Sequence, residues 1–272
     1  MMKTNNIIET LKEYKQFVES NGYTVAYIAL YGSQNYGLDL YTKDYQSDLD
    51  AKAVIVPTLD DLVYNCKPVS KVLEYKGNQI DVKDIRSYTD TLIKANPAYL
   101  ETLFTKYYII DDRFKNEMES ILNLKDGLVN CLSCQFIRAA YGMMCEKEKA
   151  FSHPYPATID KIEKYGYDPK QLHHIVRLWY LIEVYIHEKK YVLRPQEANI
   201  QFLLDIKQGK FSFDEAVKQR DYYMSLGKNA KDEYLSKIDE NKIDYSAKYK
   251  VVDLSRQIIE QKIIDEVLSN HV

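Results

Sequence analysis

Three aspartates in the first third of the chain have the type and spacing needed for metal chemistry. Asp48 and Asp50 are separated by one leucine at the start of an apolar run, and Asp81 stands between Ile80 and Val82. A buried carboxylate is costly unless it is paired or binds a cation. Alternate residues of a strand share a face, about 7 Å apart at Cα, so Asp48 and Asp50 can converge on two metal ions about 4 Å apart.

The ligand set favours a hard cation. Asp81 lies in the second strand of an expected hairpin, and that strand can pair beside the strand of Asp48 and Asp50. Three carboxylates without His or Cys suit two Mg²⁺ ions, or Mn²⁺, better than zinc. We therefore predict Asp48, Asp50 and Asp81 as catalytic and metal-binding residues. The plainer alternatives stay open: an exposed strand start for the first two, and a solvent-facing hairpin position for Asp81.

A Gly-Ser pair supplies a second functional feature. Gly32 and Ser33 end an apolar strand and open a short helix, for which Ser33 is the expected N-cap. Such a turn presents backbone N–H groups to phosphate, and the Ser33 hydroxyl can donate to a phosphate oxygen. Gly-Ser is also common in ordinary turns. Together with the three acids, however, it predicts phosphoryl or nucleotidyl transfer, in which metals activate a hydroxyl and hold a triphosphate.

Hydrophobic periodicity and turn signals predict the elements that must position these residues. Expected in order are a helix over 6–20, a strand over 23–32, a polar loop over 39–46, a strand over 47–57, a short helix capped by Thr58, a hairpin over 71–85 turning at Lys76-Gly77-Asn78, a helix from Ser87 to Ala95 that resumes after Asn96-Pro97, and a short strand over 106–111. This pattern indicates a mixed sheet with flanking helices.

From about residue 113 the apolar period becomes that of helices and stays so to residue 270. We expect an α+β fold in which an all-helical C-terminal domain follows the sheet domain. The boundary is predicted near Lys125-Asp126-Gly127, giving a catalytic domain over 1–125 and a helical domain over 126–272 packed on it.

Composition excludes several classes of protein. The chain has 272 residues, 46% hydrophobic and 28% charged, with a formal net charge of −3. These values fit a folded protein and argue against extended nonspecific duplex binding. No apolar run reaches membrane-spanning length and the N-terminus is polar, so we expect a cytoplasmic protein with no membrane partner. The Cys131–Cys134 pair lacks a matching zinc or redox context and is expected to be buried thiols.

A second constellation lies on one predicted helix in the C-terminal half. Lys170, His174 and Arg177 fall at i, i+4 and i+7, which places them on one stripe. A basic stripe can contact a triphosphate or an RNA backbone, so we predict these three as nucleotide-binding residues. The alternative, a solvated face with a structural His174, has equal weight.

Two motifs carry a family resemblance. The residues Gly32-Ser33-Gln34-Asn35-Tyr36-Gly37, followed by Ser47-Asp48-Leu49-Asp50, resemble the DNA-polymerase-β-like nucleotidyltransferase superfamily. Within it, the Tyr-Gly pair and Ser47 resemble the predicted nucleotidyltransferases of an RNA-repair pathway in bacteria and phages. The stretch Gly166–Pro195 is similar to that family's Gly-Tyr-Asp-x-Lys, His-x-x-Arg-Leu and Arg-Pro pattern.

The resemblance implies a nucleotidyltransferase core, with Asp48, Asp50 and Asp81 at the metal ions and Gly32 and Ser33 at the triphosphate. Two features depart from the family pattern. The loop before Asp48 is a few residues longer than expected, and Lys52 stands where an Arg is expected.

The predicted activity is Mg²⁺-dependent transfer of NMP from an NTP such as ATP to a hydroxyl acceptor, with release of pyrophosphate. An RNA or tRNA end is a candidate acceptor, since fold alone does not determine the acceptor. Two alternatives stay open: an inactive nucleotide-sensing or partner-binding module of the same fold, and a toxin–antitoxin type enzyme that modifies a partner protein or tRNA. The sequence leaves the base, the acceptor and the oligomeric state undetermined.

Overall fold

The protein was analysed as a computed structural model, which describes residues 4–41, 46–156 and 158–269. The chain forms two compact units, residues 1–132 with 244–272, and residues 133–243. This division differs from the predicted domains 1–125 and 126–272. The reason is the last helix, α13 (Ser246–Ser269), which packs against α4, α6 and α7 of the first unit.

The first unit contains a five-stranded mixed sheet with the order β3-β4-β2-β1-β5. Its elements are α1 (Thr4–Ser20), β1 (Thr24–Tyr31), α2 (Ser33–Tyr36), β2 (Asp50–Val56), α3 (Leu59–Val63), β3 (Ser70–Tyr75), β4 (Asn78–Asp84), α4 (Ile85–Ile93), α5 (Pro97–Phe104), β5 (Tyr108–Ile110), a 3₁₀ turn (Asp112–Phe114), α6 (Lys115–Asn123), α7 (Lys125–Cys131) and α13. Strands β2 and β4 pair in parallel, and the other pairs are antiparallel. The predicted mixed α+β composition is thus observed.

Local sequence accounts for several of these boundaries. The β3–β4 hairpin turns at Lys76 and Gly77, whose φ angles of 51° and 78° suit a two-residue hairpin loop. Thr58 caps α3 in a capping box with Asp61, as expected. The other two predicted caps are wrong.

In helices α2 and α4 the observed N-cap lies one and three residues before the expected serine. The N-cap of α2 is Gly32, not Ser33. The N-cap of α4 is Asp84, whose Oδ1 accepts from Arg86 N at 2.8 Å, so that helix begins before Ser87. A buried aspartate at the end of β4 therefore serves both the strand and the following helix.

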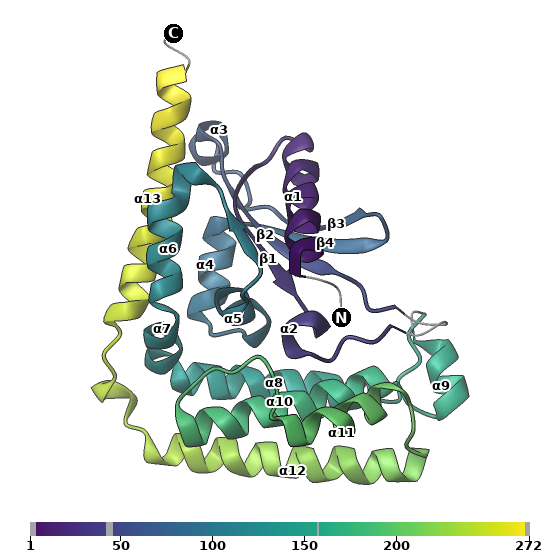
Figure 1. The fold of residues 1–272 in the computed structure, drawn as a ribbon. Coiled ribbons are helices and arrows are strands. Elements are labelled where there is room, and N and C mark those ends of the chain that lie inside the picture. Colours follow the sequence, from purple (N-terminus) through teal and green to yellow (C-terminus); the bar gives the residue numbers. More distant parts are fainter. Residues whose placement is uncertain (1–3, 42–45, 157, 270–272) are drawn as a thin grey trace. The chain divides into compact units, whose positions relative to one another are not determined.

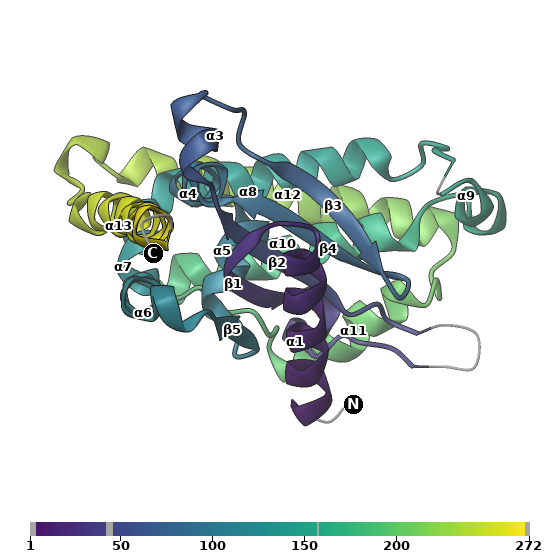
Figure 2. The same cartoon turned by 90° about the horizontal axis from the view of Figure 1, so that it is seen from above.

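Alternation along β2 assigns its side chains to two faces of the sheet. Ala51, Ala53 and Ile55 join a core formed with α1, whose buried residues there are Ile7, Leu11, Tyr14 and Val18. Helices α4 and α5 pack on the opposite face, and Tyr27 OH donates to the Thr102 carbonyl. Figures 1 and 2 show α1 on one side of the sheet and α4 and α5 on the other. Asp50, Lys52 and Val54 consequently point away from α1.

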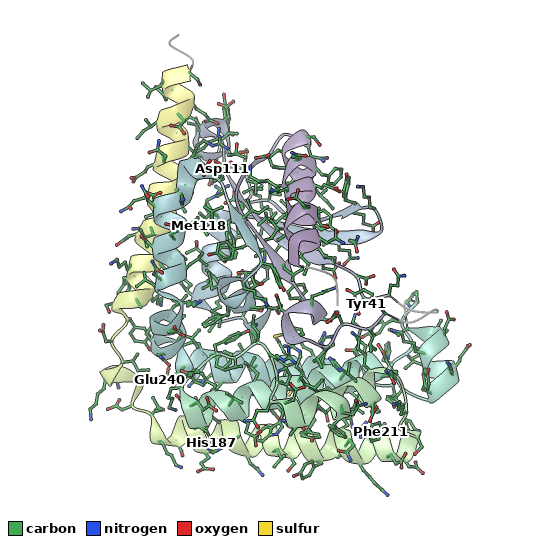
Figure 3. All side chains as sticks on the ribbon, viewed as in Figure 1. Tyr41, Asp111, Met118, His187, Phe211 and Glu240 are labelled. Carbon is green, nitrogen blue, oxygen red and sulfur yellow. The ribbon has the colours of Figure 1, made fainter. Side chains whose placement is uncertain are left out.

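An acidic residue links the edge strand to α1. Asp111, labelled in Figure 3 just after β5, lies 2.9 Å from Lys15 Nζ and accepts from Arg113 Nε at 2.7 Å. Burial acts to raise the pKa of Asp111, but Arg113 and Lys15 outweigh it and lower that pKa to about 2. This carboxylate is therefore an anchor of the first unit.

The second unit is all-helical, as the sequence predicts. It consists of α8 (Ser133–Ala150), α9 (Ile159–Tyr165), α10 (Pro169–Glu188), α11 (Glu197–Lys207), α12 (Phe213–Lys237) and a 3₁₀ turn (Glu240–Lys242). Helix α10 is central, packing against α8, α11 and α12, and Leu172, Ile175, Leu178 and Ile182 on it are fully buried. Among the described helices of both units, none has the length and apolarity needed to cross a membrane. Cys131 and Cys134 are buried free thiols, as expected.

Candidate active site

The sheet register places Asp50 and Asp81 on one face. Lys52 of β2 is the register partner of Asp81 of β4, and Asp50 lies two residues before Lys52. The Gln79 backbone N–H, two residues before Asp81, donates to Asp50 Oδ1 at 3.0 Å. The predicted pairing of these two strands is therefore observed, and the metal-binding role of the two acids stays a prediction.

Asp48 lies before the strand. The strand expected over 47–57 begins only at Asp50, so the alternation that was to align Asp48 with Asp50 does not extend to Asp48. The Asp48 side chain is exposed, and its carbonyl accepts from Gln34 Nε2 at 2.6 Å. An exposed carboxylate is solvated by water, so it carries little desolvation cost.

The Gly-Ser turn lies at the same end of the sheet as these acids. Tyr31, the last residue of β1, is the register partner of Asp50, and Gly32 follows directly. The Gln34 side chain then connects α2 to Asp48. Two segments that are separated in the sequence by a loop are thus brought together by one antiparallel strand pair.

A buried glutamate holds this turn, and sequence reasoning missed it. Glu101 of α5 is 1% exposed. Its Oε1 accepts from Gly32 N and from Asn35 Nδ2, each at 2.9 Å, and its Oε2 accepts from Tyr36 OH. The backbone N–H of Gly32, one of the two residues predicted to face the triphosphate, is thus directed at Glu101. The available signal was a charged residue inside the apolar stretch AYLETLF, where burial demands partners.

The third predicted acid has close partners within the protein. Asp81 Oδ2 lies 2.8 Å from Lys52 Nζ and accepts from Tyr99 OH at 2.6 Å. Burial acts to raise the pKa of Asp81, but the charge and hydrogen bond of Lys52, together with Tyr99, hold it below its ordinary value. The same environment raises the pKa of Tyr99, through burial first and the hydrogen bond to Asp81 second.

The fit of these residues to Mg²⁺ differs between the acids. Asp48 and Asp50 offer hard oxygen donors two residues apart, and Mg²⁺ is commonly held by one or two carboxylates together with substrate phosphates. Asp81 fits less well as a third ligand, because Lys52 and Tyr99 already bind its Oδ2. In keeping with that, no group of three or more His, Cys, Asp or Glu in the described part of the chain is arranged to hold a metal ion.

Ser47, which the family resemblance singles out, has a structural contact. Its Oγ accepts from Leu40 N and its backbone N–H donates to the Leu40 carbonyl, both at 2.9 Å. These bonds close the base of the polar loop expected over 39–46. Residues 42–45 of that loop lie outside the described residues.

The basic stripe of the second unit lies on α10, as expected. Lys170 is exposed in the first turn. The pKa of His174 is lowered well below its usual value, by desolvation first and then by Arg177. Arg177 lines a pocket together with Tyr180, Arg194 and Asn199. Their binding role stays a prediction.

The motif that precedes this stripe has a local structural explanation. Gly166, with φ of 79°, ends α9 in the left-handed conformation. Tyr167 is fully buried and stacks on Phe151 at 5.1 Å between centroids. Asp168, also fully buried, caps α10 by accepting from Lys170 N at 2.9 Å. The Gly-Tyr-Asp part of the resemblance is therefore accounted for by helix ends and packing.

Comparisons with known proteins add little to this geometry. No protein-family model matches the sequence. A search of curated proteins gives no match either. Among solved structures, the chain is similar to a nucleotidyltransferase-like protein from Exiguobacterium sibiricum 255-15, with 9% identity over 92% of this chain and 79% of that chain. The TM-score is 0.28, so this likeness carries no weight for fold or activity.

Proposed function

We propose that the protein is a Mg²⁺-dependent nucleotidyltransferase that moves NMP from an NTP onto a hydroxyl acceptor and releases pyrophosphate. The observation that supports this most is the pairing of Tyr31 with Asp50, which brings the Gly32-Ser33 turn beside the two acids. Asp81 lies on the same face of the adjacent strand. Acids for cations next to a turn for phosphate are the parts that such a reaction requires.

Each residue has a distinct proposed role. Asp48 and Asp50 would hold the divalent cations, which when bound supply charge neutralisation for the triphosphate and acidify the attacking hydroxyl. Asp81 would complete the site on the side of the nucleophile. The Ser33 hydroxyl would donate to a β- or γ-phosphate oxygen. Glu101 would keep the turn in place by accepting the hydrogen bond from the Gly32 backbone N–H.

The acceptor and setting are proposed from the resemblance alone. An RNA or tRNA end in an RNA-repair reaction in the cytoplasm is the first choice. Lys170 and Arg177 are proposed as cationic phosphate contacts, since cationic side chains bind phosphate independently of sequence. His174, whose pKa is lowered well below its usual value, is proposed as a neutral hydrogen-bond donor beside them.

The test is transfer of label from each α-labelled NTP to total RNA or lysate with Mg²⁺. We compare wild type, Asp48→Ala/Asp50→Ala and the control Asp60→Ala/Asp126→Ala, which removes two exposed aspartates of the same unit. The first double variant is expected to lose at least about 100-fold in rate, because metal-assisted transfer depends on those charges. Equal labelling by wild type and Asp48→Ala/Asp50→Ala would refute the proposal.

A nucleotide-sensing module of the same fold is the second candidate. The observation in its favour is the Lys52–Asp81 ion pair, because a carboxylate already paired with a lysine needs no metal. Binding of labelled NTP without transfer to any acceptor, in wild type and in the acid variants alike, would favour this candidate.

A further inference from the structure

Lys52 is a buried lysine next to the predicted metal site. It lies on β2 two residues after Asp50, is 6% exposed, and its Nζ is 2.8 Å from Asp81 Oδ2. A lysine this deeply buried needs a strong compensating interaction. Here the compensation is a carboxylate that the proposed function assigns to a metal ion.

We propose that Lys52 is an internal counter-ion of Asp81 that competes with a divalent cation for the same carboxylate. This inference rests on the proposed function. In the protein without metal, the ammonium group neutralises Asp81; when a cation binds to Asp48 and Asp50, Asp81 is released to join it. Lys52 is thus a positioning residue that lowers the affinity of the site for metal alone.

Geometry places the ammonium group where it can compete. Asp50 and Asp81 lie on neighbouring strands, two residues apart in register, with Lys52 directly opposite Asp81. Cα atoms in this diagonal relation are about 8 Å apart, so a cation shared by the two carboxylates must lie between them. The Lys52 side chain projects from the same face and already contacts one of the two.

Two tyrosines keep Lys52 in this position. Its Nζ lies 4.2 Å from the Tyr31 ring centroid and 4.3 Å from that of Tyr99. The face of an aromatic ring attracts a cation, most strongly where water is excluded. Tyr99 also donates to the Asp81 Oδ2 that Lys52 contacts. Removing either donor from that oxygen should therefore free Asp81 for a metal.

Lys83 provides a matched control on the same face. It lies two residues after Asp81 on β4, and its Nζ is 4.2 Å from the same Tyr99 ring. The pKa of Lys83 is lowered, mainly by burial, and the ion pair to Asp81 Oδ2 is formed by Lys52. Lys83→Met therefore removes one positive charge from the neighbourhood without removing a donor from Asp81.

The experiment measures Mn²⁺ affinity of the full chain without nucleotide, from the loss of the free-ion signal in electron paramagnetic resonance. Lys52→Met is expected to bind Mn²⁺ at least about tenfold more tightly than wild type, within the range of typical coupling between two sites. Lys83→Met should raise the affinity less than Lys52→Met does, because Lys83 acts on Asp81 through its charge, whereas Lys52 acts through its charge and a hydrogen bond. Adding Asp81→Asn to Lys52→Met should abolish the gain.

Tyr99→Phe serves as a second variant, because Lys52→Met removes one partner of a buried ion pair and can unfold the protein. It keeps the ring but removes the other donor to Asp81 Oδ2, and we expect it to tighten Mn²⁺ binding two- to fivefold, less than Lys52→Met does. Unchanged or weaker binding in both variants, an equal gain in Lys83→Met, or no Mn²⁺ binding in any protein would overturn the inference. The transfer assay reports separately on the proposed function, since it compares Asp48→Ala/Asp50→Ala with wild type.

Discussion

Replacement of Glu101 by alanine tests whether a buried carboxyl group holds the Gly-Ser turn. Glu101 is 1% exposed and accepts from three groups of one turn, Gly32 N, Asn35 Nδ2 and Tyr36 OH. All three donors belong to the segment proposed to face the triphosphate. The variant therefore leaves several donors of that segment without their acceptor, at the place where the turn must be rigid.

The magnitude follows from those contacts. Leaving one buried donor unsatisfied costs about 1–3 kcal/mol, and water that enters the space recovers part of this. Loss of the side chain also creates a cavity with its own cost. We therefore expect Glu101→Ala to lower the free energy of unfolding by about 3–5 kcal/mol. Glu101→Gln keeps one acceptor oxygen and should cost about 1–2 kcal/mol.

Urea unfolding followed by far-ultraviolet circular dichroism measures both variants. The expected loss for Glu101→Ala shifts the midpoint by about 1–2 M, given the slopes usual for domains of this size. Glu119→Ala is the control, because Glu119 is exposed and its ion pair with Lys115 is long, at 4.0 Å. A loss below about 1 kcal/mol for Glu101→Ala, or one equal to that of the control, would refute the anchoring role.

Two further predictions concern carboxylates outside the site. Asp111→Asn should lower the free energy of unfolding by about 1–2 kcal/mol at pH 6, since a pKa lowered to about 2 stabilises the fold above the ordinary aspartate pKa. That contribution is lost as pH falls from about 4 to about 2, so unfolding curves of wild type and variant should converge there; a constant difference at all pH values would contradict it. Asp168→Ala should cost about 1–3 kcal/mol through loss of the buried cap of α10. The exposed Asp214→Ala should cost less in the same urea assay, and equal losses would argue against the structural reading of the Gly-Tyr-Asp motif.

Features set by neighbouring residues were predictable from the sequence. The Lys76-Gly77 hairpin and the Thr58 cap of α3 depend on residues within three positions of each other, and both are observed. Misplaced caps show where a local signal competes with another. Ser87 is a good capping residue, but Asp84 stands three positions earlier and begins α4 instead.

Features set by packing between distant segments were not predictable. Glu101 contacts Gly32 across 69 positions of the chain, because helix α5 packs against strand β1. Nor does periodicity show which unit a helix joins. The apolar positions of α13 indicate a helix, while its packing against α4 and α6 is decided by shape and by contacts such as Thr89 Oγ1 with Ser255 Oγ at 2.8 Å.

The desolvation cost of a carboxylate in an apolar strand is met in a different way for each of the three acids. Asp48 is exposed to water, and the half-buried Asp50 accepts from the Gln79 backbone N–H at 3.0 Å. Asp81 is compensated by the ammonium group of Lys52, which lies 2.8 Å from its Oδ2.

Groups that must receive a ligand cannot be fully satisfied by the fold, whereas groups that only stabilise it are. By that criterion Asp81, held by Lys52 and Tyr99, has the contacts of a residue that stabilises the fold, and its metal-binding role stays a proposal. The affinity of Lys52→Met for Mn²⁺ distinguishes a metal-binding role of Asp81 from a purely stabilising one. Removal of Lys52 is expected to tighten Mn²⁺ binding only where Asp81 can coordinate the metal ion.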